Sequence, residues 1–157
     1  MNTTLGRRTL VAGAVAGLLL PLAARAQTLD PDAQEPTDMR LRFAFSTFTM
    51  TAMLYDNPSA RDFFGMLPLD LTINDFGPNE KIAYLPRKLT EEGAGVFENE
   101  QPYDLCYYRP WGNLAMFYAG YEHPGLIRLG RFEQGYQALH ERGEFPLRLE
   151  AIQEDAA

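Results

Sequence analysis

One aromatic stretch, Tyr107–Tyr118, is the part of the chain best suited to binding another molecule. It holds the single tryptophan, Trp111, in a Pro-Trp-Gly-Asn connection between two strand-like runs. Large rings with polar edges suit the wall of a groove, although Tyr and Phe within a strand more often belong to a core. Trp111 lies in the connection and is the ring least easily explained by packing. The predicted groove residues are Arg87, Tyr108, Trp111, Asn113, Met116 and Phe117.

Two arginines could add a hydrogen-bond donor to this groove. Arg87 follows a short strand predicted over 82–85, and our hypothesis is that it points over Trp111. The alternative is that Arg87 and Lys88 are solvated surface charges, the commoner role of basic residues after a strand. Arg109, inside the aromatic stretch, is the second possible donor.

Residues typical of hydrolytic or metal chemistry are few and scattered. His123 and His140 are far apart in the sequence, and no HxxxH or CxxC spacing occurs, so no metal site is predicted. Ser46 and Ser59 have no neighbouring histidine or nucleophile-elbow motif. The chain also lacks a glycine-rich phosphate loop, and we expect no cofactor.

Alternating apolar and polar residues predict about eight short strands, with clear examples over 40–45, 69–74 and 145–152. Turn signals about every 8–12 residues between the strands are typical of a β-sandwich or β-barrel. Two short helices are expected at the strand ends, one starting at Pro58 and one over 134–142.

Within 105–109, alternation separates two faces of a strand. Leu105, Tyr107 and Arg109 share one face, and Cys106 and Tyr108 share the other. We expect the face with Cys106 and Tyr108 to be the inner one. Cys106 is the only cysteine, so it is either buried or available for an intermolecular disulfide, and burial is favoured.

Residues 1–26 have the features of a secretory signal peptide. Arg7-Arg8 precede an apolar run over 10–22, and Ala24-Arg25-Ala26 fits cleavage before Gln27. The run is shorter than the roughly 20 residues that span a bilayer, so no membrane span is expected after cleavage. The paired arginines suggest the twin-arginine route, with the general secretory route as the alternative. A periplasmic or secreted protein is predicted.

The rest of the chain is strongly acidic. Cleavage leaves 11 basic residues against 21 acidic ones, a net charge of −10. Such a protein repels phosphate groups, so nucleic acid is not an expected partner. Residues 27–38 lack apolar periodicity and are predicted to be a flexible tail before a domain over 39–153.

Five short motifs together resemble the small bacterial cyclophilin-like domain family, whose members are largely uncharacterised. The motifs are Met39-Arg40-Leu41-Arg42, Leu54-Tyr55-Asp56-Asn57-Pro58-Ser59-Ala60, Glu80-Lys81-Ile82-Ala83-Tyr84-Leu85-Pro86, Tyr107-Tyr108-x-Pro110-Trp111-Gly112-Asn113-Leu114 and Ile127-Arg128-Leu129-Gly130. The resemblance implies a mainly β fold, a closed eight-stranded cyclophilin-like β-barrel with two short capping helices. True cyclophilins use an arginine in a Phe-His-Arg string, which this chain lacks.

We therefore expect an exported, non-catalytic binding module that takes a small molecule or an extended, proline-containing peptide beside Trp111. One alternative is a low-activity periplasmic peptidyl-prolyl cis-trans isomerase, in which an arginine donates to the prolyl nitrogen within the aromatic pocket. That enzyme would act on a barrier of about 18–20 kcal/mol. The other alternative is a partner subunit that uses the barrel surface.

Overall fold

The computed structural model of the protein describes residues 34–92 and 94–153. The predicted signal peptide and its cleavage site lie outside the described residues, as does most of the predicted tail. The first strand begins at Pro36, three residues before the domain start expected at Met39. In the described ranges no helix is long and apolar enough to cross a membrane.

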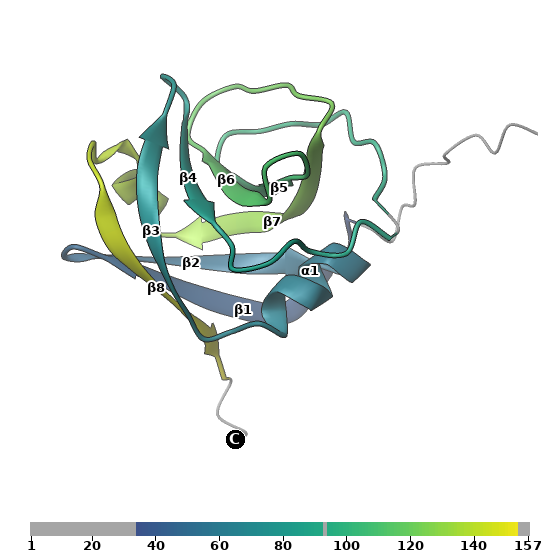
Figure 1. Ribbon diagram of the computed structural model, residues 1–157, viewed down its shortest axis with the longest axis horizontal. Coiled ribbons are helices and arrows are strands. Elements are labelled where there is room, and N and C mark those ends of the chain that lie inside the picture. The colour runs from purple at the N-terminus through teal and green to yellow at the C-terminus, as the bar shows by residue number, and fades with distance from the viewer. Residues whose placement is uncertain (1–33, 93, 154–157) are drawn as a thin grey trace, which may run out of the picture.

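Eight antiparallel strands close into a barrel in the order β1-β2-β7-β5-β6-β4-β3-β8 (Figure 1). Their bounds are β1 Pro36–Phe45, β2 Phe48–Tyr55, β3 Leu69–Phe76, β4 Glu80–Tyr84, β5 Asp104–Tyr108, β6 Asn113–Phe117, β7 Leu126–Gln134 and β8 Phe145–Ile152. The predicted closed, mainly β, eight-stranded barrel is confirmed. Closure gives each of these strands a partner on both sides.

The two predicted helices differ in kind. In α1 (Pro58–Phe64), the Asn57 side chain accepts a hydrogen bond of 2.8 Å from the Ala60 amide and so caps the helix. The second element, η2 (Tyr136–His140), is a 3₁₀ helix and is shorter than the helix expected over 134–142. It has only five residues and starts after Gly135, whose φ of 70° interrupts helical geometry.

The helices lie at opposite ends of the barrel. The helix α1 follows the end of β2, whereas Gly135, just before η2, packs against Thr49 near the start of β2. Ala60 and Phe63 of α1 join the barrel core from one end, and Leu139 of η2 joins it from the other. The interior itself is filled by apolar side chains from all eight strands.

The aromatic stretch faces two ways. Leu105 and Tyr107 of β5 point into the barrel core, whereas Cys106 packs outside it with Ala115 and Phe117 of β6. The expectation that the Cys106 face is the inner one was therefore wrong. Rings from the connecting loops pack over the outer face too, so both faces of β5 are apolar and alternation does not distinguish them. The predicted burial of Cys106 is confirmed.

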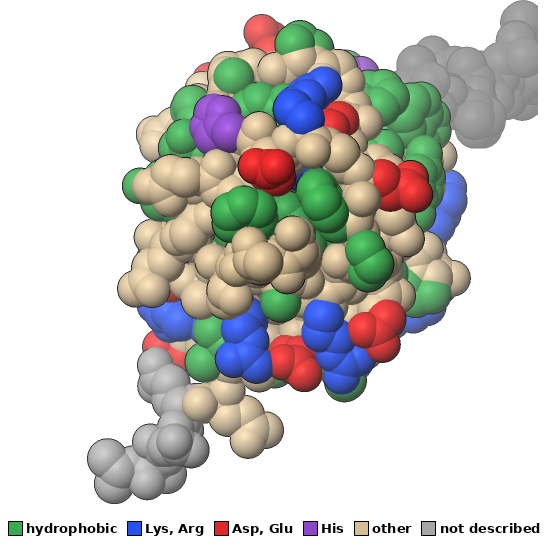
Figure 2. Space-filling view, turned by 90° about the vertical axis from the view of Figure 1, so that its left-hand side faces the viewer, with side chains coloured by type: hydrophobic (Ala, Val, Ile, Leu, Met, Phe, Trp, Pro, Cys, Tyr) green, Lys and Arg blue, Asp and Glu red, His purple; other side chains and the backbone are tan. Residues whose placement is uncertain are grey.

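Exposed ion pairs lie along the outside of β1, β8 and β3. Arg42 pairs with Glu150 at 2.6 Å, and Arg148 pairs with Asp70 at 2.8 Å. Figure 2 shows one face of the molecule on which basic and acidic side chains lie next to each other along one edge. Exposed pairs of this kind contribute little to stability, typically about 0–1 kcal/mol.

Candidate functional site

A groove of about 360 Å³ lies on the outer face of β4, β5 and β6. Its rings are those of Phe76, Tyr108, Trp111, Phe117, Tyr121 and His123. Its polar side chains are those of Asn79, Glu80, Asn113 and Glu122. We call it the aromatic groove. The remaining lining residues are aliphatic, so no lysine or arginine lines it.

The turn between β5 and β6 places Trp111 at the rim of the aromatic groove. Gly112 takes a φ of 72°, and its amide donates a hydrogen bond of 2.9 Å to the Tyr108 carbonyl. Glycine adopts this left-handed geometry without the steric cost that a side chain brings. The Trp111 ring is 49% exposed and meets Phe76 and Tyr108 edge to face, with centroids 5.4 and 5.3 Å away.

The opposite wall of the groove is a stacked pair of rings. Phe117 of β6 lies flat on Tyr121, with centroids 3.8 Å apart and an angle of 8° between the rings. The Tyr121 hydroxyl donates a hydrogen bond of 2.6 Å to the buried carboxylate of Asp104. Asp104 also forms ion pairs with Arg131 at 3.0 Å and Arg128 at 3.4 Å. This network fixes the loop that carries Tyr121 against the barrel.

Two side chains of the groove, Glu80 and Asn113, carry acceptors without a partner. In the described part of the chain, no hydrogen bond or ion pair reaches the Glu80 carboxylate, and burial raises its pKa to about 7. Asn113 is 1% exposed and its Nδ2 donates to the Leu114 carbonyl at 3.0 Å, while its Oδ1 has no partner. An unpaired buried acceptor is costly, so a hydrogen-bond donor placed beside either group would be favourable.

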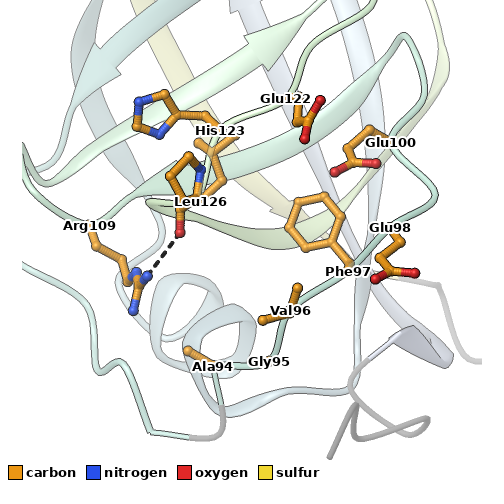
Figure 3. Close-up of a pocket in the computed structure, with 11 residues that line it drawn as sticks. Ala94, Gly95, Val96, Phe97, Glu98, Glu100, Arg109, Glu122, His123 and Leu126 are labelled. Carbon is orange, nitrogen blue, oxygen red and sulfur yellow. Dashed lines mark hydrogen bonds between the residues drawn. The ribbon is translucent and has the colours of Figure 1, made fainter. Parts of the chain in front are cut away.

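A second hollow of about 570 Å³ adjoins the aromatic groove and shares Glu122, His123 and Leu126 with it. Figure 3 shows Phe97, Glu98 and Glu100 on one side of it, and Arg109 on the other. We call it the acidic hollow, after Glu98, Glu100 and Glu122. Arg109 donates to the carbonyls of Pro124 at 3.1 Å and Gly125 at 3.3 Å, so its guanidinium holds the loop.

The structure brings four of the six predicted groove residues together, namely Tyr108, Trp111, Asn113 and Phe117. Met116 instead points into the barrel and is fully buried. Arg87 is not in the groove lining, and both of its terminal nitrogens donate to Asp62, at 2.7 and 3.1 Å. These hydrogen bonds lower the pKa of Asp62. A binding role for the four groove residues remains a prediction.

Sequence reasoning missed Phe76, Glu80 and Tyr121. Glu80 lies opposite Phe117 because β4 pairs with β6, although the chain between them includes a long loop and β5. No local sequence pattern indicates this pairing. Phe76 and Tyr121 stand at a strand end and in a loop, where rings have no periodicity to reveal them. The only available signal was that these residues are aromatic. Solvated loops carry few aromatic side chains, so a ring next to a turn is unusual there.

Metal and thiol chemistry find no support in the described ranges 34–92 and 94–153. No group of three or more His, Cys, Asp or Glu side chains there is placed to hold a metal ion. Burial raises the pKa of the Cys106 thiol above its usual range, which favours the neutral thiol over the thiolate.

Comparison with known proteins shows a family and a related solved structure. No curated protein matches the sequence. The solution structure of a hypothetical protein from Archaeoglobus fulgidus has the same fold, with a TM-score of 0.55 and 18% sequence identity. The alignment covers 75% of this chain and 98% of the archaeal one. Residues 43–150 match the family described as the cyclophilin-like family. The chain belongs to the cyclophilin-like family.

Proposed function

We propose that this protein is a non-catalytic binding module that takes a small organic molecule in the aromatic groove. The observation that carries the proposal is the half-exposed Trp111 ring, edge to face with Phe76 and Tyr108. A hydrophobic ring left open to water inside a concave, ring-lined site is available to a ligand. The groove volume of about 360 Å³ falls within the range of small-molecule sites, about 300–1,000 Å³.

A small molecule fits this site better than an extended peptide. Peptides are commonly bound in extended form by adding a strand to a free sheet edge. Each of the eight described strands already has two partners, so the barrel offers no such edge. Recognition must then come from side chains, which is the usual way in which a compact ligand is held.

Prolyl isomerase activity has less support. Neither possible donor arginine lines the groove: Arg87 is held by Asp62, and Arg109 is held by the carbonyls of Pro124 and Gly125. The proline-peptide alternative is kept as an outcome of the test below.

The test uses the indole N–H signal of Trp111, which is unique because the chain has one tryptophan. We expect this signal to shift saturably in NMR titrations of the mature protein with small aromatic probes such as phenol and 2-phenylethanol. A short Ala-Pro peptide, followed by exchange spectroscopy, is expected to show neither a comparable shift nor faster cis-trans exchange.

Ligand-observed NMR on variants completes the test. Trp111→Ala is expected to abolish probe binding. The matched control is Tyr84→Ala. It removes an exposed ring of β4 that does not line the groove, and it is expected to leave binding intact. Absence of a shift with every probe would refute the proposal, and accelerated exchange of the Ala-Pro peptide would replace it with the isomerase.

Export of the protein is also part of the proposal, and it rests on the sequence of residues 1–26. Fractionation of cells that express the full chain should place the shortened protein outside the cytoplasm. Replacing both Arg7 and Arg8 by lysine should block that transport if the twin-arginine route is used. Unchanged export of the double variant would favour the general secretory route, and a full-length cytoplasmic protein would end the export proposal.

A further inference from the structure

We infer that the ligand of the aromatic groove is an organic cation, a protonated amine carried on a small apolar body. This inference rests on the proposed binding function and adds the chemical class of the ligand. It is carried by the juxtaposition of unpaired acceptors, Glu80 and Asn113, with a wall of aromatic rings.

The first step concerns the charge of Glu80. It is the first residue of β4 and lies opposite Phe117 in the β4–β6 pairing, so its side chain belongs to the outer face. The neighbouring Lys81 is on the inner face and pairs with Asp75 at 2.7 Å. With no lysine or arginine in the groove lining, the described protein supplies no cation to the Glu80 carboxylate.

The second step concerns the other titratable groups of the groove. Glu122 adds a second acidic group, and burial raises the pKa of the Tyr121 phenol above its usual range. The His123 Nδ1 accepts a hydrogen bond of 3.1 Å from the Gly125 amide. That nitrogen is therefore used as an acceptor within the protein. Among the described residues, no lysine or arginine lines the groove to balance its two acidic side chains.

The third step concerns the acceptors and the rings. The Nδ2 of Asn113 must face the Leu114 carbonyl, because only the amide nitrogen can donate to it, and this leaves Oδ1 as the unpaired atom. An ammonium group is a donor with no acceptor, which matches a site that offers acceptors. The faces of aromatic rings also attract cations and pack against hydrocarbon.

A neutral ligand would leave the Glu80 charge without compensation, and an anion would be repelled by it. A protonated amine compensates the charge and covers the exposed rings with its apolar body. Burial raises the pKa of the unpaired Glu80 to about 7, and a bound ammonium would lower that pKa. Amine binding near pH 7 should therefore release a fraction of a proton, which calorimetry in two buffers of different ionisation enthalpy detects.

The closing experiment compares three probes of one shape on the mature protein by calorimetry and by the Trp111 indole signal. The probes are 2-phenylethylammonium, the neutral 2-phenylethanol and the anionic 3-phenylpropionate. We expect the ammonium to bind about tenfold more tightly than the alcohol, as charge-assisted hydrogen bonds imply. The anion should not bind measurably.

Two charge-neutralising variants locate the effect. Glu80→Gln should lower ammonium affinity about tenfold and leave alcohol affinity unchanged. The matched control, Glu98→Gln, removes the same charge from the acidic hollow outside the groove and should change neither affinity by more than about twofold.

The outcomes separate this inference from the proposed function. Equal binding of alcohol and ammonium, lost in Trp111→Ala, would overturn the cation inference and keep the binding module. No binding of any probe would overturn the proposed function itself. A terminally blocked, lysine-containing dipeptide is tested as a fourth probe. Tighter binding of this peptide than of 2-phenylethylammonium would overturn the assignment to a small molecule.

Discussion

The two faces of β5 and β6 use similar residues for different purposes. The inner face contributes Leu105, Tyr107 and Met116 to the core, and all three are fully buried. The Tyr107 hydroxyl accepts a hydrogen bond of 3.1 Å from the Leu89 amide, so even the polar atom of this ring is paired. The outer face instead ends in the aromatic groove, where the Trp111 ring remains half exposed.

The two faces therefore differ in burial and in charge compensation. Inside, apolar side chains form the core, and the buried Lys81 pairs with Asp75 at 2.7 Å. Outside, the charge of the Asp104 carboxylate is compensated by Arg128 and Arg131, whereas no basic side chain in the described part of the chain compensates the Glu80 carboxylate. If the aromatic groove binds a ligand as proposed, variants of the two faces should affect stability and binding separately.

The largest expected effect lies in the compensated half of the outer face. Asp104→Asn removes the carboxylate from two arginines, one of them buried, and should destabilise the protein by about 3–5 kcal/mol. Urea unfolding measures the loss. The control is Asp70→Asn, which breaks an exposed pair with Arg148 and should cost at most about 1 kcal/mol. Equal losses in both variants would contradict the distinction between buried and exposed pairs.

A core variant tests the inner face. Met116→Ala leaves a cavity in the barrel and should lower the free energy of unfolding by about 2–5 kcal/mol. Trp111→Ala removes a larger but half-exposed ring, and we expect it to cost clearly less. Both are measured by chemical denaturation. If Trp111→Ala proved the more destabilising, Trp111 would be a packing residue and the separation of faces would fail.

The smallest expected effect depends on pH and concerns Glu80. Burial raises its folded-state pKa from 4.5 to about 7, so the folded protein holds a proton that the unfolded chain has already released. Stability should therefore fall as pH rises from about 4.5 to about 7. Glu80→Gln has no charge to bury and should be more stable than the native protein at pH 8, by about 1 kcal/mol after allowance for partial exposure.

Thermal unfolding at pH 4 and pH 8 checks this sign. The advantage of Glu80→Gln should vanish at pH 4, where the native carboxyl is protonated in both states. An advantage that is independent of pH would show that the effect comes from packing, and the unpaired state of Glu80 would no longer explain it.

Several strands could be predicted from the sequence because alternation marks a strand wherever one face meets water, whereas the closed barrel was implied by the family resemblance. The strands over 69–74 and 145–152 were found in this way, and their places in β3 and β8 agree. The faces of β5 could not be assigned from alternation, because loops cover its outer side and the residues there are apolar as well.

The candidate site could be predicted only where it is local. Tyr108, Trp111 and Asn113 come from a single turn, so their proximity follows from the sequence. Glu80 and Tyr121 reach the same groove through strand pairing and a loop, and the partner of Arg87 is Asp62 of α1, 25 residues away. Contacts of this kind depend on the closed fold and have no short-range signal.

Closure of the barrel also bears on how the chain folds. The first strand pairs with the last, from Arg40 opposite Ile152 to Phe45 opposite Leu147. Contacts so distant in sequence form slowly, because a long loop must close before they contribute. The barrel cannot be completed during synthesis until β8 has left the ribosome. A transport route that accepts only folded proteins would thus receive this chain only after β8 has emerged and paired.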